Sequence, residues 1–492
     1  EVFGDGIDQN CDSFDFDPSI TRVIASTGSD SNPCMVDSPG LTLNHCLATS
    51  APGENIAIMQ GTYTYTAATN VAITSGSRII QGGFADSGGQ ILADSTPNQT
   101  ILEIPNTYVL LVDNLNTDAV ELNNLTISGS PQMASGAAPT TGLIHVKNSS
   151  IVLDNIYVDL NDDDYNAVGI FYDHSGTVDL ELQILNSNIA IDSVSPNTVG
   201  TSCPGVAAGV YIANTLTKNL TVSIDNTKIS TAAFGTANCT AAMDSKAYGI
   251  LIDNAGTGEI TAYVTTNNIA LNESTKAYGL LLDSVTSSEI FNNEIHTVDQ
   301  TAQQHGVFLQ SASAAYTHES KLKNNLIHTE GSFGNTDATG IQSININTTL
   351  INNTFFQKKT RSINNIKFYS INYHDLSATN NMFYTDYSFK DPININISGT
   401  LPAVADGIPG NLTISKMAYN NFYNNGYSYP VYYYNMKLSE DCADTYDTDG
   451  DGADDGIDSD CGYVETDCGT GTCCSDGIDN DMNGYADDYD TE

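Results

Sequence analysis

Short runs in which apolar and polar residues alternate recur along most of the chain. One recurring run places a small residue and a glycine before three or four apolar residues: AVGIFYD (167–173), AAGVYIAN (207–214), AYGILIDN (247–254), AYGLLLDS (277–284) and QHGVFLQS (304–311). The runs are too short for helices, and a period of two residues is typical of strands that bury one face. The pattern predicts a chain built almost entirely of short β-strands.

An Asn-rich corner precedes a second kind of short strand. It occurs in LNNLTI (122–127), LDNIYV (153–158), FNNEIHT (291–297), KNNLIHT (323–329), INNTFFQ (351–357) and TNNMFYT (379–385), among others. From Asn124 to Asn421 the corner returns about every 33 residues, a period typical of solenoid repeats. The repeat predicts a right-handed parallel β-helix, an all-β fold in which each unit of two or three strands forms one coil.

Asn suits such corners because it tolerates positive φ better than most residues. Stacked Asn side chains are then expected to hydrogen-bond along the column. The alternative fold is an antiparallel β-sandwich, whose hairpins would favour Asn-Gly or Asp-Gly turns. Such turns are nearly absent between the predicted strands, so we favour the β-helix.

The start of the repeat region adds a resemblance to a known family. The segments VIASTGSDSNPC, LTLNHCLATSAPGENIAIMQGTYTYT and SRIIQGGF lie between residues 23 and 84. They resemble the start of many secreted β-helix proteins of the pectin-lyase-like superfamily, which implies a first strand, a turn and a short N-terminal capping helix. We expect Leu41, Cys46 and Leu47 to cover the apolar end of the stack, because an open sheet edge invites another chain.

The chain is strongly acidic, and its acidic residues are concentrated near the ends. With 59 Asp and Glu against 16 Lys and Arg, the net charge is −43, which excludes nucleic acids and anionic membrane surfaces as partners. No apolar run approaches the length of a membrane span, so we expect no membrane insertion.

Residues 438–492 hold 19 acidic residues and no basic one. We therefore predict an Asp-rich segment (1–20), a β-helix (21–436) and an irregular, Cys/Asp-rich, calcium-binding tail (437–492).

The spacing of the acidic residues in the tail predicts two calcium loops. In each loop, oxygen ligands occupy positions 1, 3, 5, 9 and 12, a glycine occupies position 6, and the backbone carbonyl of position 7 completes the set. The predicted ligands are Asp447, Asp449, Asp451, Ala453, Asp455 and Asp458 in the first loop, and Asp479, Asp481, Asn483, Tyr485, Asp487 and Asp490 in the second. A disordered acidic tail is the alternative interpretation.

Both loops depart from an EF-hand, because position 12 is Asp and no amphipathic helices flank them. They resemble the calcium repeats of the thrombospondin type 3 class and the DGxDNDxxGxxD repeats of bacterial surface proteins. This resemblance implies calcium-stabilised, extracellular, structural segments.

The N-terminal segment contains half of the same motif. In DGIDQNCDSFDFD (5–17), Asp8, Asn10 and Asp12 occupy positions 1, 3 and 5, but Ser13 replaces the glycine. The motif is either degenerate or completed by ligands from another segment, in the same chain or in a neighbouring subunit.

The ten cysteines predict an oxidising compartment. No zinc-like pair of CxxC motifs is present, and we expect disulfides Cys34–Cys46 and Cys203–Cys239. The chain begins at Glu1 rather than Met, so we expect a mature secreted product, its signal peptide removed, located outside the cell or on its surface.

Few residues are arranged in the motifs of polysaccharide lyases or hydrolases. The three arginines are Arg22, Arg78 and Arg361, the run DDD (162–164) has no motif partner, and QHG (304–306) stands alone. A lyase needs a base to abstract a proton, so we expect no enzyme activity. His296 and His328 occupy matching repeat positions; they are interpreted as a surface ladder, with a metal pair as the alternative.

The sequence thus favours an extracellular structural protein: a calcium-stabilised β-helical subunit that assembles head-to-tail, through its acidic termini, into a surface layer or filament. The alternative is a monomeric carbohydrate-binding or adhesive cell-surface β-helix with glycans as partners. A polysaccharide lyase or hydrolase is the third and weakest hypothesis.

Overall fold

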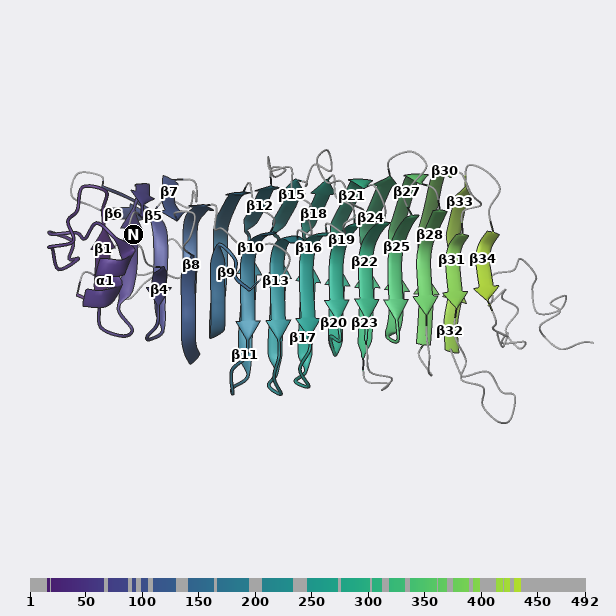
Figure 1. Cartoon of the computed structure of the whole chain (residues 1–492), viewed down its shortest axis with the longest axis horizontal. Helices are drawn as coiled ribbons and strands as arrows, with labels where there is room; N and C mark the ends of the chain where they lie inside the picture. The colour runs from purple at the N-terminus through teal and green to yellow at the C-terminus, as the bar shows by residue number, and fades with distance from the viewer. Residues whose placement is uncertain are drawn as a thin grey trace, which may run out of the picture.

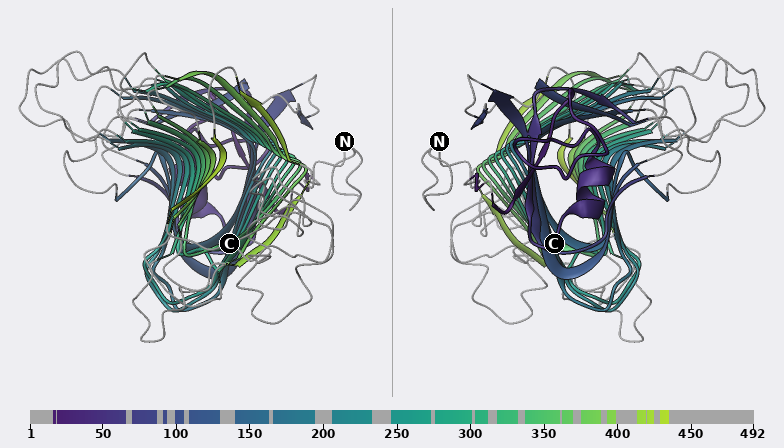
Figure 2. Two further views of the ribbon diagram at one scale, coloured as in Figure 1. Left: turned by 90° about the vertical axis from the view of Figure 1, so that its right-hand side faces the viewer. Right: turned by 90° about the vertical axis from the view of Figure 1, so that its left-hand side faces the viewer.

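The computed structural model is an elongated coil of parallel strands with one short helix at its N-terminal end (Figure 1). The structure describes residues 16–17, 19–65, 70–86, 91–93, 99–104, 109–129, 140–162, 166–193, 206–232, 246–272, 276–300, 303–311, 318–331, 337–360, 362–369, 375–388, 393–398, 413–418, 420–424 and 429–434. Viewed along its axis, the coil has a roughly three-sided outline (Figure 2). The predicted right-handed parallel β-helix is confirmed, and the β-sandwich is wrong.

Each side of the coil is a ladder of parallel strands, one per turn, which we name faces A, B and C. Face A contains β4 (Val71–Ile73), β10 (Asn166–His174), β13 (Val206–Asn214), β16 (Lys246–Asn254), β19 (Lys276–Asp283), β22 (Gln303–Gln310), β25 (Asp337–Ile344), β28 (Ser362–Tyr369), β31 (Ile393–Ser398) and β34 (Tyr429–Tyr434).

Face B follows face A in each turn. It contains β1 (Thr21–Ile24), β2 (Asn55–Met59), β5 (Arg78–Asp86), β11 (Leu180–Leu185), β14 (Leu220–Asp225), β17 (Ile260–Thr265), β20 (Ser287–Phe291), β23 (Glu319–Lys323), β26 (Asn347–Ile351), β29 (Asp375–Thr379) and β32 (Thr413–Ala418).

Face C closes each turn. It contains β3 (Gly61–Thr64), β7 (Thr100–Ile104), β12 (Asn188–Ser193), β15 (Lys228–Ala232), β18 (Asn268–Asn272), β21 (Glu294–Gln300), β24 (Leu326–Gly331), β27 (Thr354–Thr360), β30 (Met382–Ser388) and β33 (Asn421–Asn424). The long strands β8 (Leu110–Gly129) and β9 (Ile144–Asp162) each contribute a rung to all three faces. Only β6 (Ile91–Ala93), paired with β5, is antiparallel among the described strands.

Aliphatic side chains fill the inside of the coil because every second residue of each strand points inward. On face A, one inward column consists of Ile170, Val210, Ile250, Leu280, Val307, Ile341 and Ile366, all fully buried and in register. Because each rung pairs with the rung above, the register fixes which outward side chains become neighbours.

Two Asn columns build the corner between faces B and C, as the repeat predicts. The outer column has positive φ at Asn124, Asn155, Asn186, Asn226, Asn292, Asn324, Asn352 and Asn380. The next residue in each turn points inward, and from Asn267 to Asn420 these side chains bond rung to rung, with each side-chain nitrogen donating to the side-chain oxygen of the following Asn. The expected Asn ladder is confirmed.

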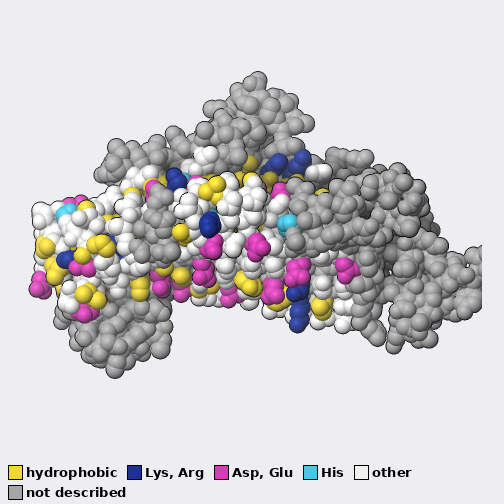
Figure 3. Space-filling view, turned by 90° about the horizontal axis from the view of Figure 1, so that it is seen from below, with side chains coloured by type: hydrophobic (Ala, Val, Ile, Leu, Met, Phe, Trp, Pro, Cys, Tyr) yellow, Lys and Arg dark blue, Asp and Glu magenta, His cyan; other side chains and the backbone are white. Residues whose placement is uncertain are grey.

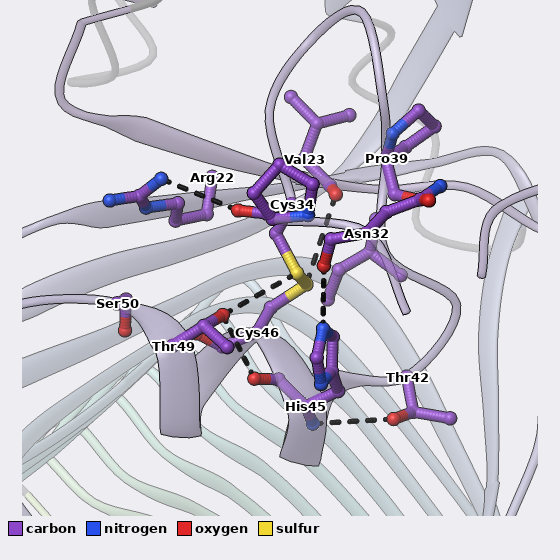
Figure 4. Close-up of a disulfide and its surroundings, with 12 residues drawn as sticks. Arg22, Val23, Asn32, Cys34, Pro39, Thr42, His45, Cys46, Thr49 and Ser50 are labelled. Atoms are coloured by element: carbon purple, nitrogen blue, oxygen red, sulfur yellow. Dashed lines mark hydrogen bonds between the residues drawn. A yellow bond between two sulfur atoms is a disulfide. The ribbon is translucent and has the colours of Figure 1, made fainter. Parts of the chain in front are cut away.

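The N-terminal end of the coil is covered by α1 (Leu43–Thr49), which a disulfide joins to the preceding loop (Figure 4). Cys34 and Cys46 are bonded with a Cα–Cα distance of 5.7 Å, as expected. Cys46 is buried and Leu47 packs against the core, but Leu41 is 39% exposed. Leu43 takes the place that the sequence assigned to Leu41, because the helix begins only after Thr42, whose side chain accepts a hydrogen bond from the backbone N–H of His45.

Candidate functional site

The predicted calcium ligands lie outside the described residues, in 1–15 and 435–492. Cys203 and Cys239 also lie outside them. Within the described ranges, no group of three or more His, Cys, Asp or Glu side chains is placed to hold a metal ion. Nor does that part of the chain contain a helix long and apolar enough to cross a membrane.

The arginines that the sequence raised as catalytic candidates are structural where they are described. Arg22 donates two hydrogen bonds to Glu54, at 2.9 and 2.7 Å. Arg78 is buried and donates to Ser50 Oγ and to the carbonyl of Ser75. Arg361 and the side chains of 162–164 lie outside the described residues.

The QHG run also packs into the fold. Gln304 is fully buried and donates to the carbonyl of Glu330. The ring of His305 stacks on Tyr278, with centroids 5.0 Å apart and an interplanar angle of 8°. Burial lowers the pKa of His305 to about 3, so at neutral pH this ring is an uncharged member of an aromatic column on face A.

A column of outward side chains runs along face C, one per rung. The strand register places in this column, in order, Thr64, Glu103, Ser128, Asp159, Ala190, Ser230, Ala270, His296, His328, Phe356 and Tyr384. The side chains of this column change along the coil: those of the first part are polar, those of the middle part are small, and those of the last part are aromatic.

The aromatic part, which we name the aromatic ladder, consists of His296, His328, Phe356 and Tyr384. Successive ring centroids are 5.2, 4.7 and 4.7 Å apart. These distances match the strand spacing of about 4.8 Å in a β-sheet, because each ring comes from the same position of successive rungs. The side chains of His296 and His328 are 30% and 21% exposed, and Phe356 and Tyr384 are also partly exposed.

Sequence reasoning found half of this ladder. It placed His296 and His328 in matching repeat positions, and their in-register pairing on β21 and β24 is confirmed. It missed Phe356 and Tyr384, although each follows the first Asn of its corner by four residues, as both histidines do. The signal was therefore present in the repeat, at a position not compared across units.

Two carboxylates and a lysine flank the aromatic ladder. The Nε2 atom of His296 lies 2.8 Å from Glu294 Oε1, and that of His328 lies 3.8 Å from Glu330 Oε2. Lys358 Nζ lies 4.0 Å from Glu330 Oε1. Burial lowers the pKa of His328, and the neighbouring His296 lowers it further, which favours the neutral form of the His328 ring.

The polar part of the column borders a groove over β7, β8, β9 and β12. This polar groove has a volume of about 580 Å³ and is lined by residues that include Glu103, Ser128, Tyr157, Asp159, Asn186 and Asn188. Between the groove and the aromatic ladder, the column consists of the small side chains of Ala190, Ser230 and Ala270. The column on face C therefore has a polar end and an aromatic end.

No protein-family model matches the chain, and no curated protein matches it. Solved structures with a similar arrangement are a complex of XylC with xylose (10% identity, TM-score 0.34, covering 82% of each chain) and the pectate lyase Pel9A (12%, 0.27, covering 84% of this chain and 81% of that one). The A-module of the Azotobacter vinelandii mannuronan C-5 epimerase AlgE6 also matches (13%, 0.23, covering 71% and 91%). Scores at this level support no argument about activity.

Proposed function

We propose that the protein is an extracellular β-helix that binds a linear glycan along face C. The observation that carries this proposal is the aromatic ladder, in which four partly exposed rings lie one per rung. Aromatic side chains bring large apolar area, and the exposed parts of these stacked rings form an apolar strip against which the C–H groups of sugars can pack. The carboxylates of Glu294 and Glu330 beside the rings are suited to accept hydrogen bonds from sugar hydroxyls.

The shape of the face suits an extended polymer better than a compact ligand. Nine rung steps separate Glu103 from Tyr384 along one column, which at about 4.8 Å per step gives a track of about 43 Å. A ribbon-like glycan repeats its rings at a similar interval, so successive sugars can meet equivalent positions of successive rungs. A small metabolite would occupy only a fraction of this length.

Charge narrows the class of glycan. The chain has a net charge of −43, and face C carries the acidic residues Glu103, Asp159 and Glu294. Figure 3, which views the coil from below, shows further acidic side chains on the sides away from face C. A long-range potential of this sign repels polyanions. We therefore propose a neutral or cationic glycan rather than a polyuronate.

The disulfide supports a location outside the cytoplasm. Cys34 and Cys46 are fully buried and bonded beneath the loop that closes the N-terminal end. Disulfides persist in secreted and surface proteins and are rare in reducing compartments.

The experiment that tests this function is a binding panel of soluble linear glycans, read by affinity electrophoresis and calorimetry. The proposal expects binding of at least one neutral or cationic linear polymer and none of a polyuronate. Assays of reducing ends and of unsaturated ends on the same panel test the enzyme alternative, and we expect no release of either. Binding of polyuronates alone would contradict the proposal.

We keep calcium-dependent, head-to-tail self-assembly as a second proposal. It is supported by the ligand spacing in the two tail loops and by the half motif at residues 8–12. The residues of the proposed joint lie outside the described part of the chain. The two proposals are compatible, since an assembled filament would still expose face C.

A further inference from the structure

The first rungs of face B carry a second apolar cluster, on the outer side of the sheet. Val23, Ala57 and Phe84 belong to this buried cluster, which is separate from the main core. Their strand neighbours Ile24 and Ile58 belong to the main core, and successive side chains of a strand point to opposite faces. Val23 and Ala57 therefore point out of the coil, and we name their group the outer cluster.

The outer side of face B is polar on β11, β14 and β23. The outward side chains there are Glu181 and Gln183 on β11, Thr221 and Ser223 on β14, and Glu319 and Lys321 on β23. Water solvates such side chains, so these rungs need no further layer. An apolar outer side is stable only where another segment removes it from water.

Phe16 covers part of the outer cluster. It is 1% exposed, and its ring centroid lies 6.2 Å from that of Phe84. The chain then turns at Asp17, whose carbonyl accepts hydrogen bonds from the backbone N–H groups of Ile20 and Thr21 before β1 continues. The residues that precede Phe16 therefore start from a point on the outer side of face B.

A groove of about 540 Å³ continues from the outer cluster. Its described lining includes Val23, Val36, Met59 and Phe84, which belong to the outer cluster or pack against it. A β-bulge in β5 brings Phe84 opposite Met59. Asp37 is the only ionisable side chain in the described lining. The groove is therefore suited to an apolar side chain and offers no basic group to an acidic ligand.

We propose that this groove holds the N-terminal segment of the same chain, residues 1–15, with Phe14 as the anchor. The segment lies outside the described residues, but it is joined directly to Phe16, which already packs on the outer cluster. In an extended chain, side chains two residues apart point to the same side and lie about 7 Å from each other. Phe14 can thus reach the groove beside Phe16 and bury a large apolar area there.

The groove would also position the half motif of the N-terminal segment. Asp8, Asn10 and Asp12 precede Phe14, and Asp12 does so by only two residues. Anchoring of Phe14 would keep these oxygen ligands at the capped end of the coil. The inference does not depend on glycan binding, because the groove lies on face B and the aromatic ladder lies on face C.

Photochemical crosslinking in the full-length chain tests the occupant. Phe14→p-benzoylphenylalanine places a ring that bonds to neighbouring C–H groups on illumination, and Phe3→p-benzoylphenylalanine is the control in the same segment. We expect position 14 to crosslink to the groove, foremost to Met59, and position 3 not to do so. Each variant is mixed with unmodified chain labelled with ¹⁵N, so that mass spectrometry separates crosslinks within one chain from those between two copies.

Hydrogen exchange gives a second measurement that needs no bulky residue. The backbone N–H of Gln60 donates to the carbonyl of Phe84 at 2.7 Å, and both residues line the groove. Phe14→Ser should speed amide exchange at residues 57–60 several-fold, whereas Phe3→Ser should leave it unchanged. Exchange in β14 of the same molecule is the internal reference, so a general loss of stability does not imitate the effect.

Crosslinks to the ¹⁵N-labelled chain would overturn binding within one chain and assign the groove to the segment of a second copy. Crosslinks from position 14 that avoid the groove would overturn the proposal, as would exchange at residues 57–60 that Phe14→Ser leaves unchanged.

Discussion

Asn293 donates from its side-chain nitrogen to the side-chain oxygen of Asn325, 3.0 Å away, and Asn325 repeats the same bond to Asn353 at 2.9 Å. The same oxygen of Asn325 also accepts from the backbone N–H of Asn293. Asn325 in addition donates to the carbonyl of Ile290. One side chain thus satisfies backbone and side-chain groups on neighbouring rungs, which explains why the corner returns with Asn in so many turns.

Replacement of Asn325 by Ala should destabilise the coil by about 3 kcal/mol, because buried partners on both neighbouring rungs lose their bonds. Asn268→Ala is the control, since Asn268 is exposed and donates only an exposed bond to Glu294; it should cost less than about 0.5 kcal/mol. Urea unfolding of both variants provides the comparison. Equal stability of the two variants would contradict a structural role for the ladder.

His305 makes stability depend on pH. Its pKa is about 3 in the folded chain against an ordinary value of 6.5, so below pH 6.5 the unfolded chain binds a proton that the folded chain does not. The stability is complete above pH 6.5 and falls, as pH drops towards 3, by about 1.4 kcal/mol per pH unit. His305→Tyr, which continues the Tyr248–Tyr278 stack, should remove this loss. Urea unfolding measures how much the free energy of unfolding falls between pH 7 and pH 5. We expect this fall to be about 2 kcal/mol smaller in the variant than in the wild type. Identical losses would contradict the assignment.

Removal of the Cys34–Cys46 disulfide should loosen the N-terminal cap. The bond closes a loop with a sequence separation of 12 residues, for which the chain-entropy model gives about 3 kcal/mol. The double variant Cys34→Ala/Cys46→Ala should therefore melt at a lower temperature. Gly40→Ala should act in the same direction, because its Cβ would lie 2.3 Å from Cys46 Sγ. A melting curve unchanged by both variants would show that the cap contributes little to global stability.

Calcium removal tests the second proposal. Particle size is measured by electron microscopy and light scattering, first in millimolar calcium and then in chelator. Long, regular filaments that fall apart in chelator are the expected result, since bound cations would neutralise the acidic ends. Filaments that persist in chelator would place the contact in the β-helix ends, and monomers under both conditions would overturn the self-assembly proposal.

The sequence predicted the fold well because the fold repeats. The same Asn corner recurs in successive turns. Asn124, Asn292 and their equivalents could therefore be predicted as corner residues without knowledge of their spatial neighbours. The sequence did not predict which leucine of the capping helix is buried. Leu41 and Leu43 are both apolar, and only the capping hydrogen bond of Thr42 decides which one is buried. The polar groove could not be predicted, because Glu103 and Asp159 share a column only through the β7–β8–β9 register, and the intervening chain lengths differ.

The most direct measurement of glycan binding on face C is the affinity of the best glycan for Phe356→Ala, Tyr384→Ala and Tyr263→Ala. Phe356 and Tyr384 stack with centroids 4.7 Å apart, whereas Tyr263 is 39% exposed on β17 of face B. We predict that each ladder variant binds about five- to tenfold more weakly, corresponding to about 1 kcal/mol per lost ring contact, and that Tyr263→Ala binds like the wild type. Unchanged affinity in both ladder variants, or an equal loss in all three, would contradict glycan binding on face C.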